Sequence, residues 1–185
     1  AGRFERVAPA RGPVDLLHGE VVAAMCGLVL GRGDHDLAAA VRQGEGLGIG
    51  HREGALVSTH CCGNTDWSMI VDAGVDILSF DAWEFAEKMG IYAAQIQGLL
   101  ARGGWLAWGI VPTSPAVMDL DGPALLRRLR DAQDGLVSSG VDERLVRDRA
   151  LITPSCGTGP LTVPQAQRVY ALLSELGSLH ASGDA

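Results

Sequence analysis

The sequence has no apolar run long enough to cross a membrane, which takes about 20 consecutive apolar residues. Its longest apolar stretch, residues 21–30, is interrupted by glycine and follows Glu20. Residues 1–6 lack the basic-then-apolar order of a secretory signal peptide. We therefore expect a cytoplasmic protein without a membrane segment.

Basic side chains are too few to balance the acidic ones. Lys and Arg together number 15, against 22 Asp and Glu, so the formal charge is −7 at pH 7. A surface that binds nucleic acid or an anionic membrane needs the opposite sign. The composition predicts that neither is a partner.

Cysteine is also scarce, with four residues in a chain of 185. Small secreted domains held by disulfides carry cysteine more densely. Two of the four, Cys61 and Cys62, are adjacent and poorly placed for a structural disulfide. We expect reduced thiols and, with 47% hydrophobic residues, an ordinary globular core.

Nucleotide-binding loops are missing too. The glycine-rich residues 44–50 depart from G-x-G-x-x-G at Ile49 and His51, and the Lys-Ser/Thr of a P-loop is absent. A flexible connector is the simpler interpretation of this segment.

What the sequence does have, from residue 55 onward, is an alternation of apolar strands and longer helical stretches. The expected strands are 55–60, 75–80, 105–111 and 150–153, and the expected helices are 66–73, 91–101, 123–138 and 163–176. Such alternation predicts a parallel sheet covered on both faces. Residues 1–54 are expected to form a separate amino-terminal segment, irregular over 1–13 and helical over 14–30 and 36–43.

Metal-ligating residue types follow the first and the last of these strands. His60 and Cys62 are two positions apart, so their side chains point the same way on an extended strand. Cys156 follows the last strand. Active sites lie at the carboxyl ends of strands in parallel barrels and in doubly wound sheets alike, so this placement does not choose between the folds. One nitrogen and two sulfur ligands suit Zn²⁺, provided that they meet in space.

Four segments together resemble a known family, the cobalamin-independent methionine synthases, in their carboxy-terminal catalytic domain. The segments are 60–67, 77–81, 105–113 and 151–157, and the resemblance covers about residues 55–178. More broadly, they resemble the uroporphyrinogen decarboxylase-like superfamily. The resemblance implies an α/β fold of the (β/α)8 TIM-barrel type. It also implies a zinc-dependent methyltransferase of methionine biosynthesis that acts on a homocysteine-type thiol.

Carried over residue by residue, the resemblance implies that His60, Cys62 and Cys156 bind zinc together with a carboxylate. The carboxylate position falls on Asp81, where the family's methionine synthases have Glu. Glu84, one helical turn further on, is the alternative ligand. No catalytic residue separate from the metal site is expected.

Three other residues near these segments have competing interpretations. Asp66 and Trp108 are candidates for substrate contact, but Asp66 also suits a helix amino terminus and Trp108 suits packing. Cys61 points to the opposite side of its strand from its neighbours, which favours a small buried residue over a ligand.

The length of the chain limits the barrel. A complete (β/α)8 barrel typically needs ~250 residues, and only four strand-helix units follow residue 55. We expect the carboxy-terminal half of a barrel, completed by another copy of the chain or by a complementary subunit. The first hypothesis is a methyltransferase with a small-molecule thiol and a methyl donor as substrates. The alternative is a non-catalytic metal- or ligand-binding half-barrel, a partner subunit or truncated remnant of the family.

Overall fold

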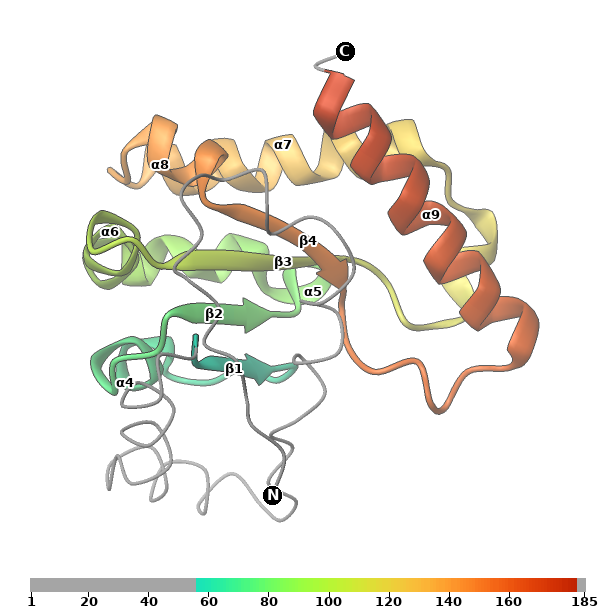
Figure 1. The fold of residues 1–185 in the computed structure, drawn as a ribbon, viewed down its shortest axis with the longest axis horizontal. Helices are drawn as coiled ribbons and strands as arrows, with labels where there is room; N and C mark the ends of the chain where they lie inside the picture. Colours follow the sequence, from blue (N-terminus) through green and yellow to red (C-terminus); the bar gives the residue numbers. More distant parts are fainter. Residues whose placement is uncertain (1–55, 183–185) are drawn as a thin grey trace, which may run out of the picture. The chain divides into compact units, whose positions relative to one another are not determined.

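Four parallel strands form a single sheet in the computed structural model, which describes residues 56–182. The strands are β1 (Ser58–Cys61), β2 (Ile77–Phe80), β3 (Trp105–Val111) and β4 (Ala150–Pro154). They lie side by side in chain order, and each neighbouring pair is parallel (Figure 1). The predicted parallel sheet in sequence order is confirmed. The expected elements within residues 1–54 lie outside the described residues.

Helices connect each strand to the next. They are α4 (Trp67–Asp72), α5 (Ala82–Phe85), the 3-10 helix η2 (Ala86–Tyr92), α6 (Ala93–Ala101), the 3-10 helix η3 (Pro115–Asp119), α7 (Gly122–Ser138), α8 (Glu143–Asp148) and α9 (Val163–Ser182). The four helices expected from the sequence are all present. The short elements α5, η2, η3 and α8 were not expected.

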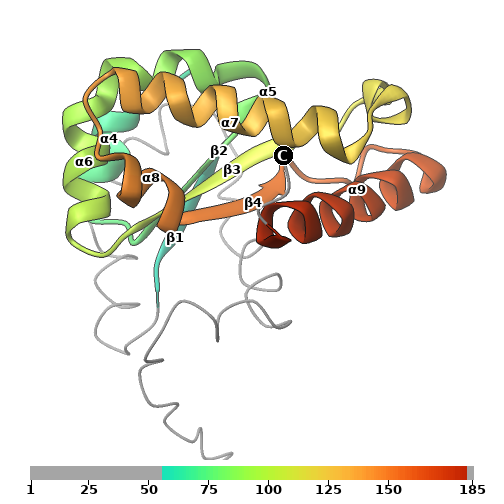
Figure 2. The same cartoon turned by 90° about the horizontal axis from the view of Figure 1, so that it is seen from above.

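Helices α4, α6 and α7 cover one face of the sheet (Figure 2). Trp67 of α4 packs edge-on against Phe80 of β2, and Phe80 packs against Trp108 of β3, with ring centroids 6.5 and 5.3 Å apart. All three rings are fully buried. Because strand side chains alternate, Ser79 and Ala107 point to the opposite face of the sheet, and both are buried there. The three buried rings therefore hold the helices on the first face of the sheet.

Gly109 allows the inner strand β3 to pass close to both of its neighbours. A Cβ atom at this position would lie 2.5 Å from the Phe80 carbonyl oxygen and 3.0 Å from that of Pro154. The pairing of β3 with β4 is also irregular between Gly109 and Val111. Glycine is thus required where the sheet is most crowded, near the carboxyl ends of its strands.

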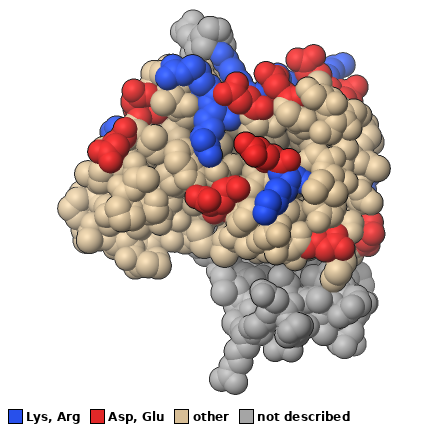
Figure 3. Space-filling view, turned by 180° about the vertical axis from the view of Figure 1, so that it is seen from behind, with Lys and Arg blue, Asp and Glu red and all other residues tan. Residues whose placement is uncertain are grey.

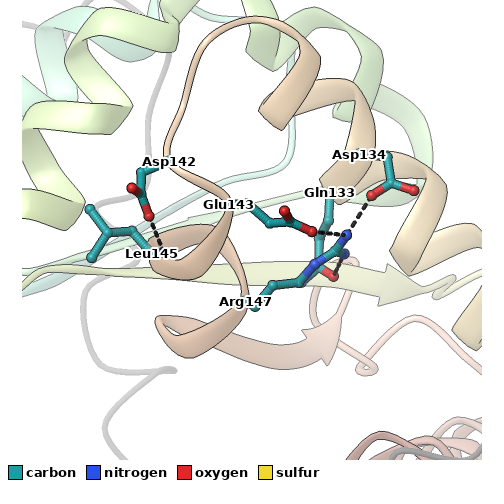
Figure 4. A network of polar contacts seen from close by, with 6 residues as sticks. All are labelled: Gln133, Asp134, Asp142, Glu143, Leu145 and Arg147. Atoms are coloured by element: carbon teal, nitrogen blue, oxygen red, sulfur yellow. Dashed lines mark hydrogen bonds and ion pairs between the residues drawn. The ribbon is translucent and has the colours of Figure 1, made fainter.

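A polar network joins α8 to α7 immediately before β4 (Figure 4). Arg147 of α8 donates to the Gln133 side chain at 2.7 Å and pairs with Asp134, and its guanidinium lies 3.6 Å from the Glu143 carboxylate. Asp142 caps α8 by accepting the Leu145 N–H at 3.0 Å. These contacts fix the direction in which the chain enters β4.

The last helix, α9, packs against α7 and lies beside β4 (Figures 1 and 2). Two contacts with the start of α7 and the residues just before it secure α9. Arg168 donates to the Leu120 carbonyl at 2.6 Å, and the Gly122 N–H donates to Glu175 at 3.2 Å. The resulting mixed α/β arrangement of four strand-helix units is compatible with half of a barrel.

Charged side chains on the helical face are interspersed in sign (Figure 3). Arg128 of α7 stacks on the Trp83 ring, with its guanidinium carbon 4.1 Å from the ring centroid, and donates to the Trp83 carbonyl.

Among residues 56–182, no helix combines the length and the apolar character that a membrane crossing needs.

Candidate metal centre

Three ligand atoms meet beyond the carboxyl ends of the strands. They come from His60 at the end of β1, from Cys62 just after β1, and from Cys156 just after β4. The His60 ring nitrogen and the two cysteine sulfurs all lie within 4.8 Å of one another. The prediction that these three residues lie close enough to share one ion is confirmed.

The loops after β1 and β4 bring the ligands together, because β1 and β4 are the outermost strands of the sheet. Strands spaced ~4.8 Å apart would put the first and the fourth roughly 14 Å from each other in a flat sheet. Both cysteines lie past their strands, so the two loops cover this distance over the ends of β2 and β3.

Ser155 holds Cys156 in this position. The Ser155 N–H donates to the Val111 carbonyl at 2.8 Å, and the Ser155 hydroxyl accepts the Thr113 N–H at 3.1 Å. Ser155 is buried, with 4% of its surface exposed. The residue before the ligand is thereby fixed to the end of β3, so that Cys156 starts from a defined place.

His60 is bonded through one ring nitrogen and free at the other. Its Nδ1 lies 2.8 Å from the Ser79 hydroxyl, and its Nε2 is buried without a hydrogen-bond partner among the described residues. Burial lowers the pKa of His60 below its ordinary value, so the ring is neutral at pH 7. A neutral imidazole with an unshared nitrogen is what a metal ion requires.

The cysteine pair favours a cation between its members. Burial raises the pKa of the Cys62 thiol, and a hydrogen bond with Cys156 and the nearby charges of Cys156 and Cys61 raise it further. Without a metal, two thiolates side by side would repel each other. A divalent cation reverses this effect and deprotonates coordinating thiols. The soft donor set and the unshared His60 nitrogen therefore suit a thiophilic divalent metal ion.

Cys61 lies outside the three-residue group, as the sequence predicts. It is half-buried and packs against the hydrophobic core, and its thiol contacts the Gly63 carbonyl at 3.5 Å. None of the three cysteines within residues 56–182 forms a disulfide.

The predicted carboxylate ligand, Asp81, has another role in the structure. One of its carboxylate oxygens accepts the Glu84 N–H at 3.0 Å and so caps α5. Asp81 is buried and Glu84 is exposed, and neither belongs to the group within 4.8 Å. Burial raises the pKa of the Asp81 carboxyl. Its ligation of a metal stays a prediction.

The two candidates for substrate contact are also engaged elsewhere. Asp66 caps α4, where its carboxylate accepts the Ser68 N–H at 3.1 Å. Trp108 is fully buried in the core. These positions match the capping and packing interpretations of the sequence, and contact of either residue with a substrate stays a prediction.

Sequence reasoning missed Ser79 and Ser155, which support the ligands. A signal for Ser79 was present, because it is the one polar residue of the buried strand β2. Its pairing with His60 needs the strand register, in which the two residues are direct partners.

Comparison with protein-family models, with curated proteins and with solved structures finds no match to this chain. Its activity must therefore be argued from the three ligand atoms and their surroundings.

Proposed function

We propose that residues 56–182 form the zinc-binding half of a methyltransferase that resembles the cobalamin-independent methionine synthases. The methyl acceptor in this proposal is a small-molecule thiol of the homocysteine type. One observation carries it: the His60 nitrogen and the Cys62 and Cys156 sulfurs converge within 4.8 Å at the carboxyl ends of parallel strands.

The number and kind of ligands support catalysis over a purely structural role. Structural zinc sites are closed by four protein ligands, whereas catalytic sites combine three with an open position. When bound, zinc would lower the pKa of a substrate thiol, so that the nucleophilic thiolate is present at neutral pH. His60, Cys62 and Cys156 would hold the ion. Asp81, the proposed additional ligand, would be displaced when the substrate thiol takes the open position.

Exposure of the site suits a small substrate. Cys62 is exposed, and His60 and Cys156 are half-buried, so a thiol can approach from solvent. A cytoplasmic location, as the sequence predicts, would keep both cysteines reduced and able to bind metal.

A half-barrel architecture belongs to the same proposal. Within the described residues, β1 and β4 each pair with a strand on one side only. An open sheet edge readily pairs with another strand. A second copy of the chain or a complementary subunit would then complete the barrel.

The same observation favours a second candidate, a metal-binding half-barrel that supplies its site to a partner and has no turnover of its own. The test is to load the purified chain with zinc and to supply homocysteine and a methyl donor. Mass spectrometry would follow the thioether product, and thiol-dependent proton release would follow thiol binding. Product supports the methyltransferase. Thiol binding without product favours the partner subunit, and a chain that binds no zinc contradicts both.

A further inference from the structure

The His60 ring has a polar partner on the neighbouring strand. His60 and Ser79 are direct partners in the parallel register of β1 and β2, and Nδ1 lies 2.8 Å from the Ser79 Oγ. Ser79 is 1% exposed and lies in a strand that is otherwise apolar. A buried hydrogen bond between side chains on two paired strands fixes the orientation of the ring.

The other nitrogen of the ring shows which tautomer this bond selects. His60 Nε2 is buried and has no hydrogen-bond partner within residues 56–182. A proton on Nε2 would be a buried donor without an acceptor, which is unfavourable. A proton on Nδ1 would instead be donated to Ser79, and the Nε2 lone pair would stay free on a ring that lies beside the sulfurs of Cys62 and Cys156.

We propose that Ser79 is a positioning residue that holds His60 as the Nδ1–H tautomer, with Nε2 available to the metal. The inference rests on the metal-binding part of the proposed function and is independent of methyl transfer. Histidines that bind metals commonly donate their second ring N–H to an acceptor that fixes tautomer and orientation. Here the acceptor is a serine hydroxyl instead of a carboxylate.

The test compares the wild type with Ser79→Ala and with a matched control, Thr153→Val. Thr153 is also a buried hydroxyl residue of the sheet, and its Oγ1 has no hydrogen-bond partner among the described residues. The ¹⁵N chemical shifts of the His60 ring in metal-free protein report the tautomer. Competition with a chelator reports zinc affinity.

The wild type and Thr153→Val should show the Nδ1–H tautomer, and Ser79→Ala should show a mixture or Nε2–H. Zinc affinity of Ser79→Ala should fall ~10–100-fold, the range found when such supporting groups are removed. An unchanged tautomer in Ser79→Ala would overturn the inference, as would an unchanged zinc affinity. Zinc binding by the wild type without methyl transfer would count against the proposed function and leave this inference standing.

Discussion

The inner strands of the sheet are buried along nearly their whole length, whereas the outer strands are largely half-buried. All four residues of β2 and all but the first of β3 are buried, while β1 is half-buried throughout and β4 has one buried residue. The three candidate metal ligands lie near the ends of the outer strands or just after them. The aromatic core residues Phe80 and Trp108 belong to the inner ones.

This division shows how one sheet can combine a buried core with a more exposed group of candidate metal ligands. A metal ion and a substrate must reach their site from solvent, so the side chains that bind them cannot be fully buried. The half-buried outer strands are therefore better placed than the inner strands to supply such side chains. The inner strands form the buried core, and one of them also supplies Ser79, which is hydrogen-bonded to the candidate ligand His60. Substitutions in the two pairs of strands should therefore differ in what they damage.

The largest effect on stability is expected from Trp108→Ala. The side chain is fully buried between Phe80 and the core, and truncating such a residue typically costs about 3–5 kcal/mol. Urea denaturation followed by circular dichroism measures the change. A loss below about 1 kcal/mol would mean that the inner strands do not carry the core as described.

The largest effect on metal binding is expected from Cys62→Ser and from Cys156→Ser. Each removes a soft, charged ligand, so zinc affinity should fall by more than the ~10–100-fold typical of losing a supporting residue. The metal-free stability should change little. Cys61→Ser is the matched control and should keep its zinc, as measured by elemental analysis of dialysed protein. Equal losses for the Cys61 and Cys62 variants would show that the wrong cysteine has been assigned.

A smaller effect on metal is expected from Asp81→Asn, because Asn also caps helices and a short carboxylate would be at most a partial ligand. Burial holds the pKa of the Asp81 carboxyl above its ordinary 3.8. The folded state therefore binds this proton more tightly, and the resulting stabilisation is complete below 3.8 and lost as pH rises through the folded pKa.

Asn does not titrate, so Asp81→Asn does not lose stability in this way as pH rises. The stability of the variant relative to the wild type should therefore increase with pH above 3.8. Urea denaturation of both metal-free proteins between about pH 4 and about pH 7 checks the sign. A relative stability that falls with rising pH would mean that the folded protein favours the charged carboxylate.

The smallest effect on stability is expected from His180→Asn in α9, which belongs to neither pair of strands. Burial lowers the pKa of His180, and the charges of Arg130 and Arg147 lower it further. The unfolded state then binds the proton more tightly. The stabilisation is complete above 6.5 and lost as pH falls through the folded pKa.

Thermal unfolding of the wild type and the His180 variant just below neutral pH should show a shallower pH dependence in the variant. His180 is half-exposed, so the difference should be small. Zinc affinity should be identical in the two proteins, and a change in affinity would tie α9 to the site.

The sequence predicts the sheet and the residues of the three-residue group, because both have local signals. The strand predicted at 105–111 has the same bounds in the structure. His60 and Cys62, two positions apart in the sequence, belong to one group of candidate ligands in the folded chain. Helix α5 escaped prediction because four residues show no helical period. Its cap, Asp81, resembles a ligand in the sequence because a cap and a strand-end ligand occupy the same position, immediately after a strand.

Two further features depend on the tertiary structure and could not be derived from local patterns. The bond between His60 and Ser79 depends on strand register, and the meeting of Cys62 with Cys156 depends on the paths of two loops. The anchoring of Ser155 on Val111 and Thr113 fixes one of these paths. Neither register nor loop path is specified by spacing along the chain.

The candidate ligands come from the first and the last described strand, so they are synthesised at different times. A ribosome adds about 5–20 residues per second, so the roughly 100 residues between Cys62 and Cys156 take about 5–20 s to emerge. Throughout this interval His60 and Cys62 are present without their third partner. Capture of the ion should therefore come late, after β4 has joined the sheet, and tight metal binding should mark a chain whose synthesis has passed residue 156.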